Sequence, residues 1–367
     1  MKNIVILATG GTIAGAGEQG KDIGYKSGSI KAQTLIDAIP ELKNVANICV
    51  EQFCNINSDD ITSEIWIALA MRIQEHLQRD DVDGIVIMHG TDTMEETAFF
   101  LSLTLGGFAP KVAGASEDCL SVVGNVAKPV ILTGSMRPAT ATEPDGPANL
   151  LFAVKSAVSL HTVIPDTVPG SPSRVELSSW SNATGSSEVY VAFAGKLMNA
   201  RSVQKIHAND LDAFAELSCP PHELSCPPPS GHLPLVNAKN SFDISNMRDL
   251  PHVSVLYFNA DADAELVRFA AERSAGLVIA GAGAGEFSRA WADAIADVIS
   301  KNKIPVVIST RINRGRIVPE QLLVPGTIAA YDLPPAKATV LLRLALTITN
   351  DSETIQKIFE DSCTSSS

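Results

Sequence analysis

Short runs of β-branched and aliphatic residues recur along the chain, and each run is closed by Gly, Thr or Ser within a few positions. Runs of this length and composition are typical of strands buried on both faces of a parallel sheet. Between them lie amphipathic stretches long enough to be the helical crossovers that parallel strands require. The runs are Ile4 to Leu7, Ile85 to Met88, Val130 to Leu132, Val253 to Phe258, Leu277 to Ile279 and Val306 to Ile308. The stretches are Ser63 to Leu77, Thr93 to Leu105 and Arg289 to Ser300. The pattern predicts an α/β fold.

A proline-rich segment divides the chain. Residues 219–240 overlap a near-duplication, in which Glu-Leu-Ser-Cys-Pro-Pro begins first at Glu216, just before the segment, and again at Glu223. Such a composition predicts a linker. We therefore expect an N-terminal domain over 1–218 and a smaller C-terminal domain over 241–367, with loop-like insertions near 108–127 and 162–187.

The first predicted strand leads into the glycine-rich sequence Thr9-Gly10-Gly11-Thr12-Ile13-Ala14-Gly15. In α/β sheets, ligands bind beyond the carboxyl ends of the strands, so this turn is a candidate site. A phosphate-binding loop would need Gly-Lys-Ser/Thr here, and a dinucleotide fingerprint would need GxGxxG; neither is present. The remaining alternatives are a tight turn capped by Thr12 and a turn that presents the Thr12 hydroxyl for chemistry.

The second predicted strand ends in a turn with a similar content, beginning at His89 and containing Thr91 and Asp92. Thr93 and Glu96 have the spacing of a capping box, so we expect Thr93 only to begin the following helix. His89 is expected to be a packed residue beside this turn. Two threonines and a carboxylate without a Ser-His pair indicate threonine nucleophile chemistry rather than a Ser-His-Asp triad.

Charge and composition exclude several classes of protein. The chain carries 28 Lys and Arg against 41 Asp and Glu, a net charge of −13 that disfavours nucleic acid and anionic membranes as partners. We find no apolar run long enough for a membrane span or a signal-peptide core, and expect a cytoplasmic protein. The six cysteines show no metal-binding spacing, so free thiols and no metal site are expected.

Three motifs resemble the bacterial L-asparaginase family, which also includes glutaminases. They are the TGGTIAG sequence around Thr12, HGTDTMEET around Thr91, and Gly134-Ser135-Met136-Arg137-Pro138. The resemblance extends to Asp145 through Leu150, to Phe242 through Ser245 and to Leu341 through Thr347. It implies a larger N-terminal domain with a mainly parallel sheet, a smaller flavodoxin-like C-terminal domain, and a homotetramer built as a dimer of intimate dimers. It also implies hydrolysis of L-asparagine to L-aspartate and ammonia without a cofactor.

The resemblance assigns the chemistry to five residues. Thr12 matches the family's usual candidate nucleophile, and Tyr25 matches a tyrosine on a mobile loop that closes over the substrate. Thr91, Asp92 and Lys205 match a Thr-Asp-Lys group. Because a neighbouring carboxylate favours the charged form of a lysine, we expect Asp92 to bind the substrate α-ammonium and Lys205 to act on Thr91 through a hydrogen bond.

The remaining matches concern substrate binding. Ser58 matches a residue that binds the α-carboxylate, and Asp59 replaces the glutamine common in exported enzymes, which leaves the substrate preference open. The partner subunit's Asp261 matches an Asn or Asp that contacts the ammonium, and Glu320 is the nearest match to a late acidic residue. Two alternatives to an asparaginase stay open: a dual glutaminase-asparaginase, and a non-catalytic relative that binds amino acids.

Overall fold

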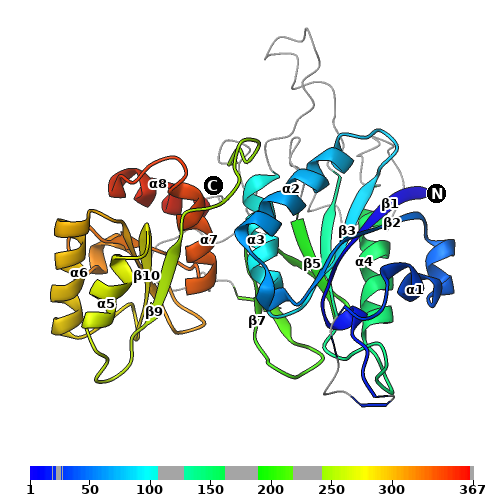
Figure 1. Cartoon of the computed structure of the whole chain (residues 1–367), viewed down its shortest axis with the longest axis horizontal. Coiled ribbons are helices and arrows are strands. Elements are labelled where there is room, and N and C mark those ends of the chain that lie inside the picture. Colours follow the sequence, from blue (N-terminus) through cyan, green and yellow to red (C-terminus); the bar gives the residue numbers. More distant parts are fainter. Residues whose placement is uncertain are drawn as a thin grey trace, which may run out of the picture. The chain divides into compact units, whose positions relative to one another are not determined.

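The computed structural model describes residues 1–18, 20, 21, 26, 28–105, 128–161, 189–217 and 242–363. Its contacts divide the chain into two compact units, which we describe separately (Figure 1). Unit 1 comprises Met1–Glu216 with Asp243–Asn246, and unit 2 comprises Leu217–Phe242 with Met247–Ser367. The predicted linker 219–240 and the predicted insertions 108–127 and 162–187 lie outside the described residues, so the predicted domain boundaries stay a prediction.

Unit 1 is built around a six-stranded sheet with the order β2-β1-β3-β4-β5-β6. All neighbouring strands are parallel except β5 and β6, which form an antiparallel pair. The strands are β1 (Lys2–Gly10), β2 (Ala46–Ile56), β3 (Gly84–Met88), β4 (Val130–Thr133), β5 (Val189–Phe193) and β6 (Lys196–Asn199).

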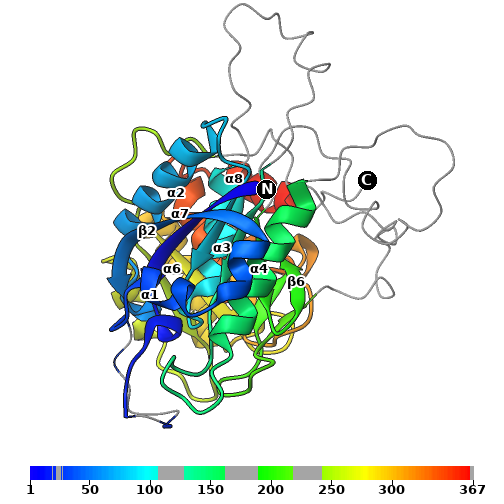
Figure 2. The ribbon, with the colours of Figure 1, turned by 90° about the vertical axis from the view of Figure 1, so that its right-hand side faces the viewer.

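Helices cover both faces of this sheet. On one face, alternate strand residues such as Ile4 and Ile6 pack into a core with Leu150 and Val154 of α4 (Gly146–His161). The short helices α1 (Ala32–Asp37) and η2 (Pro40–Asn44) contribute to the same core. Helices α2 (Ser63–Leu77) and α3 (Met94–Thr104) lie against the opposite face, and Figure 2 shows α4 on the other side of the sheet from α2. Burial on both faces explains why the central strands are continuous apolar runs.

A small hairpin beside the main sheet carries one of the predicted site residues. Strands β7 (Val203–Lys205) and β8 (Phe214–Glu216) pair antiparallel as a separate two-stranded sheet. The ring of Phe214 packs on Phe193 of β5 at 4.9 Å between centroids. The carboxylate of Glu216 accepts a hydrogen bond from the backbone N–H of Asn199 at 2.7 Å, which fastens β8 to β6.

Unit 2 contains a four-stranded parallel sheet whose strands follow the order β12-β11-β10-β9. Trp291 of α6 is the largest buried side chain in the core between this sheet and helices α5 and α6. The strands are β9 (Val253–Tyr257), β10 (Gly276–Gly281), β11 (Val306–Thr310) and β12 (Ile328–Ala329). The helices are α5 (Glu265–Ala271), α6 (Arg289–Asn302), η7 (Pro319–Gln321), α7 (Pro335–Ala345) and α8 (Ser352–Cys363). Two mainly parallel sheets with covering helices confirm the predicted α/β class.

Neither a membrane-spanning helix nor a metal-binding cluster occurs among the described residues. None of the helices in this part of the chain is long and apolar enough to cross a membrane. Within the same residues, no group of three or more His, Cys, Asp or Glu side chains could hold a metal ion.

Candidate active site

The strand order of unit 1 indicates where a ligand would bind. The first five strands follow the order 2-1-3-4-5. Strand β2 therefore lies on one side of β1, and β3 and the strands after it lie on the other side. The carboxyl ends of β1 and β3 therefore flank a topological switch point, the usual ligand site of open parallel sheets. Thr12 follows β1 in the short helix η1 (Thr12–Ala14), and Thr91 follows β3. The fold places both predicted threonine turns at this point.

Glycines allow these turns to touch. Gly11 has a φ of +78°, and a Cβ added to it would lie 2.5 Å from the backbone nitrogen of Gly90. A Cβ on Gly90 would in turn lie 2.6 Å from Oγ of Ser58. Only residues without a side chain fit such contacts. The turns after β1, β2 and β3 therefore converge on Gly90, between Thr12 and Ser58.

Lys205 completes a polar group at this edge of the sheet. Its Nζ donates hydrogen bonds to Thr91 Oγ1 at 2.9 Å and to Asp92 Oδ1 at 2.6 Å. Thr91 is buried, the Lys205 side chain is 16% exposed, and the Asp92 side chain is 67% exposed. The lysine cation therefore contacts a shielded hydroxyl at one end, while the carboxylate beside it remains open to a ligand.

Ser58 links two of the turns. It lies in η3 (Ser58–Asp60) and is buried, and its Oγ accepts a hydrogen bond from the backbone N–H of Asp92 at 3.2 Å. Its backbone carbonyl accepts a hydrogen bond from Thr93 Oγ1 at 2.7 Å. The expectation that Thr93 only begins the helix is therefore wrong. Thr93 is the N-cap residue of α3, but its side chain makes no capping hydrogen bond and binds Ser58 instead.

Four other predicted site residues are described separately from this cluster. Asp59 is exposed next to Ser58 in η3. Tyr25 lies outside the described residues. Asp261 and Glu320 belong to unit 2, so their placement beside Thr91 stays a prediction. Asp261 is exposed and has a φ of +60°, and Glu320 is exposed in η7.

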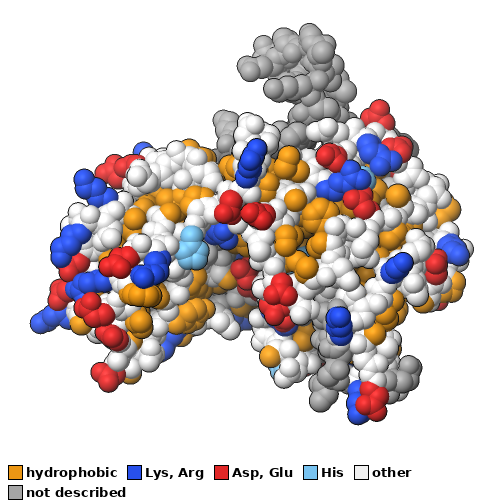
Figure 3. Space-filling view, viewed as in Figure 1, with side chains coloured by type: hydrophobic (Ala, Val, Ile, Leu, Met, Phe, Trp, Pro, Cys, Tyr) orange, Lys and Arg blue, Asp and Glu red, His pale blue; other side chains and the backbone are white. Residues whose placement is uncertain are grey.

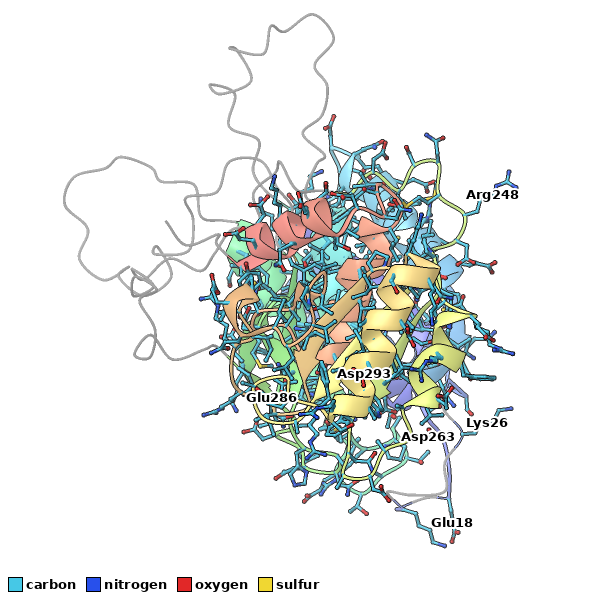
Figure 4. The ribbon with its side chains drawn as sticks, turned by 90° about the vertical axis from the view of Figure 1, so that its left-hand side faces the viewer. Glu18, Lys26, Arg248, Asp263, Glu286 and Asp293 are labelled. Carbon is cyan, nitrogen blue, oxygen red and sulfur yellow. The ribbon has the colours of Figure 1, made fainter. Side chains whose placement is uncertain are left out.

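The position of Asp261 within unit 2 is defined. It follows β9, so it lies at the edge of the sheet where the parallel strands have their carboxyl ends. Asp263 and Glu286, both exposed, follow β9 and β10 at the same edge and are labelled in Figure 4. This edge of unit 2 therefore presents several carboxylates to solvent.

Asp145 and Asn149 organise the turn after β4, although the sequence motif that contains them indicated no role for either residue. The carboxylate of Asp145 accepts hydrogen bonds from the backbone N–H groups of Met136 and Arg137, each at 2.9 Å. Asn149 donates to the carbonyl of Gly134 at 3.0 Å. These contacts fix the turn after β4 onto the first turn of α4. The Asp-Gly-Pro beginning of a helix was a signal that could have indicated them.

Among the described residues, Cys49, Cys54 and Cys363 are free thiols, whereas the other three cysteines lie outside the described residues. Cys54 Sγ donates to the carbonyl of Thr9 at 3.3 Å. Burial raises the pKa of the Cys54 thiol to about 11, which keeps it protonated beside the Thr12 turn.

His89 is fully buried at the end of β3, in agreement with a packed role. Its Nδ1 donates to the carbonyl of Gly90 at 2.7 Å, whereas its Nε2 has no hydrogen-bond partner. Burial lowers the pKa of His89 to about 4, so the imidazole is neutral in the folded protein.

This burial predicts an acid-sensitive stability. Above about pH 6.5, His89 is neutral in both the folded and the unfolded chain and has no effect on the free energy of unfolding. As the pH falls from about 6.5 to 4, the unfolded chain binds the proton first, so His89 should lower the free energy of unfolding by about 3 kcal/mol. Urea unfolding of the wild type and His89→Asn at several pH values measures this. Equal pH slopes for both proteins would contradict the assignment.

The surface agrees with the acidic composition. On the face shown in Figure 3, Lys and Arg side chains are interspersed with Asp and Glu rather than gathered in one area. Together with the net charge of −13, this arrangement gives that face no basic patch for a phosphate backbone.

Comparisons with known proteins agree with the fold. A family model described as "Asparaginase, N-terminal" matches residues 3–115, 119–168 and 177–225, and one described as "Glutaminase/Asparaginase C-terminal domain" matches 252–359. L-asparaginase 2 of Bacillus subtilis is 37% identical over 368 residues, covering 98% of this chain and 87% of the relative. A probable periplasmic L-asparaginase of Haemophilus influenzae is 35% identical over 365 residues, covering 98% and 93%.

A solved structure gives the same result. The crystal structure of a probable cytoplasmic L-asparaginase from Campylobacter jejuni matches with a TM-score of 0.75 and 33% identity, covering 98% of this chain and all of that one. A doubly wound α/β unit followed by a second α/β unit, with family matches over nearly the whole chain, defines the class of protein. The chain belongs to the asparaginase family, as its sequence motifs predicted.

Proposed function

We propose that this enzyme hydrolyses L-asparagine to L-aspartate and ammonia, with Thr12 as the nucleophile. The observation that supports this most strongly is the contact of Lys205 Nζ with Thr91 Oγ1 and Asp92 Oδ1, beside the turn that carries Thr12. A threonine hydroxyl is a weak nucleophile unless neighbouring groups assist the loss of its proton. Two hydroxyls and a lysine at one switch point provide those groups.

In the proposed reaction, Thr12 Oγ1 attacks the side-chain carboxamide carbon of the substrate. The C–O bond forms, the hydroxyl proton passes to the amide nitrogen, and the C–N bond breaks to release ammonia. Water then attacks the resulting ester, which frees L-aspartate and restores the hydroxyl of Thr12. Backbone N–H groups near Thr12 and Thr91 stabilise the oxyanion of each tetrahedral intermediate. Thr91 takes part through its hydroxyl, where the positive charge of Lys205 favours developing negative charge.

The residues around this centre suit an amino acid. The exposed carboxylate of Asp92 is open to the α-ammonium group, and Ser58 at the start of η3 offers a hydroxyl to the α-carboxylate. Asp59 adds a second carboxylate that attracts the ammonium. We assign Tyr25 to the loop that closes over the substrate. We assign the partner subunit's Asp261 to contact with the α-ammonium group, and Glu320 to the late acidic position of the family.

We further propose that the enzyme is a cytoplasmic homotetramer. The Campylobacter jejuni structure is that of a probable cytoplasmic L-asparaginase, which supports a cytoplasmic location. The Haemophilus influenzae relative is a probable periplasmic L-asparaginase, so a periplasmic location is the alternative. The role given to the partner subunit's Asp261 requires at least a dimer, and light scattering of the purified chain measures the assembly.

Ammonia release from L-asparagine and L-glutamine, measured in parallel, tests the proposed function. We expect kcat/KM to be higher for L-asparagine. The two substrates differ by one methylene, and a pocket that discriminates only by size gains about 10-fold to 200-fold from such a difference. Equal kcat/KM values would support the dual glutaminase-asparaginase that Asp59 leaves open. A folded protein that releases ammonia from neither amide would refute the hydrolase.

A further inference from the structure

Glu95, in the first turn of α3, binds the strand that carries Lys205. Its Oε2 accepts a hydrogen bond from the backbone N–H of Lys205. This contact is made to the backbone of Lys205 and not to its side chain. Glu95 acts on the backbone of the residue whose side chain contacts Thr91.

The hairpin geometry explains why this contact controls the position of Lys205. Strand β7 pairs with β8 on one side, where the backbone N–H of Ile206 donates to the carbonyl of Ala213 at 2.8 Å. The N–H of the neighbouring residue, Lys205, points the other way because alternate residues of a strand face opposite neighbours. Glu95 accepts the hydrogen bond from that N–H, so it holds the outer edge of β7 against α3.

A two-stranded hairpin is only marginally stable by itself, so its register against the rest of unit 1 depends on such contacts. Glu95 lies three residues after Asp92 and four after Thr91 in one continuous segment. One short segment therefore carries both the hydroxyl that Lys205 contacts and the carboxylate that holds its backbone. A shift of β7 would move Nζ away from Thr91 and Asp92 together.

We propose that Glu95 is a positioning residue for Lys205 and keeps its ammonium group within hydrogen-bond distance of Thr91 Oγ1. This inference rests on the proposed function, because it assumes that Lys205 assists the reaction at Thr91. In this proposal, Glu95 acts on the reaction through Lys205. Its removal should therefore lower kcat more than it changes KM.

Four variants test the positioning role against a purely structural one. Glu95→Ala should lower kcat for L-asparagine about 10-fold to 100-fold, as misplacement of a site residue by about 1 Å does, and change KM less than about twofold. Glu95→Gln keeps a side-chain oxygen at the same reach and should retain most of the activity. Glu95→Asp, one methylene shorter, should fall between them. Glu96→Gln removes a charge from the same first turn of α3 and should leave kcat within about twofold of wild type.

A double-mutant cycle gives the decisive measurement. If Glu95 acts through Lys205, Glu95→Ala should have almost no further effect on kcat in a Lys205→Ala protein. The same loss in both backgrounds would overturn the inference, as would full activity of Glu95→Ala. If thermal unfolding shows that Glu95→Ala has no folded state, Glu95→Asp replaces it in the cycle. An inactive wild type would refute the proposed function itself, whereas an active wild type with equal losses in both backgrounds would refute only the positioning role.

Discussion

Replacing Thr91 with valine should lower kcat for L-asparagine about 1,000-fold, a loss typical of removing one group that stabilises developing negative charge. Valine keeps the branched shape of threonine but lacks Oγ1, the atom that accepts the hydrogen bond from Lys205 at 2.9 Å. Thr91 is buried, so the lysine cation would face a methyl group in a shielded place. Steady-state ammonia release gives kcat and KM separately.

Thr91→Ser is the matched control for that change. It retains the hydroxyl and loses only a methyl group, so we expect activity within about tenfold of wild type, because serine orients its hydroxyl less strictly. Thermal unfolding of both variants establishes that they are folded. A folded Thr91→Val protein with nearly full activity would remove Thr91 from the reaction.

Gly11→Ala should disrupt the site and destabilise unit 1. Gly11 combines a φ of +78° with a ψ of −175°, a region essentially restricted to glycine, so alanine there is strained by about 1 to 3 kcal/mol. Its Cβ would also lie 2.5 Å from the backbone nitrogen of Gly90. Because that neighbour is backbone, the Thr12 and Thr91 turns would have to separate. Overpacking of this kind costs about 1 to 3 kcal/mol more and would displace both hydroxyls.

Gly195→Ala is the control for a positive φ without a close backbone contact. Gly195 has a similar φ of +73°, but a Cβ there would meet no atom within 4 Å. We therefore expect Gly195→Ala to lose only the conformational part, about 1 kcal/mol, with unchanged turnover. Urea unfolding and ammonia release should distinguish the two variants. Equal losses of stability and activity in both would contradict the close contact between the two turns.

The sequence predicted the buried parts of the fold well because burial on both faces produces unbroken apolar runs. Helix α2 matches its predicted span of Ser63 to Leu77, and β3 extends the predicted run by one residue. Strand β2 was missed. It lies at the edge of the sheet, and its exposed residues, among them Asn47, Cys49 and Gln52, interrupt any apolar run that would reveal it. The small strands β6, β7 and β8 are too short to show a period.

The site was predictable where chemistry follows a strand directly. Thr12 and Thr91 were found from their places after two apolar runs, and the parallel sheet brings those places together. Lys205 needed the family resemblance, because nothing near Val203 indicates that a hairpin carries the lysine back to β3. Glu95 was missed because it binds a backbone N–H more than 100 residues away, a contact that leaves no mark on either local sequence.

The capping box failed for a physical reason. Thr93 and Glu96 have the right spacing, but a threonine hydroxyl makes whichever hydrogen bond is in reach, and the Ser58 carbonyl from the neighbouring turn is 2.7 Å away. Tertiary contact therefore replaced the local cap. The spacing of Thr93 and Glu96 thus predicted where the helix begins, but it did not predict which hydrogen bond the Thr93 side chain makes.

The central proposal is that Thr12 is the nucleophile for L-asparagine at the switch point of unit 1. The most direct test measures ammonia release and L-asparagine binding by purified, folded Thr12→Ala beside the wild type. We predict that Thr12→Ala still binds L-asparagine but releases no ammonia above the uncatalysed rate. Turnover by Thr12→Ala at the wild-type rate would contradict the account and move the nucleophile to Thr91.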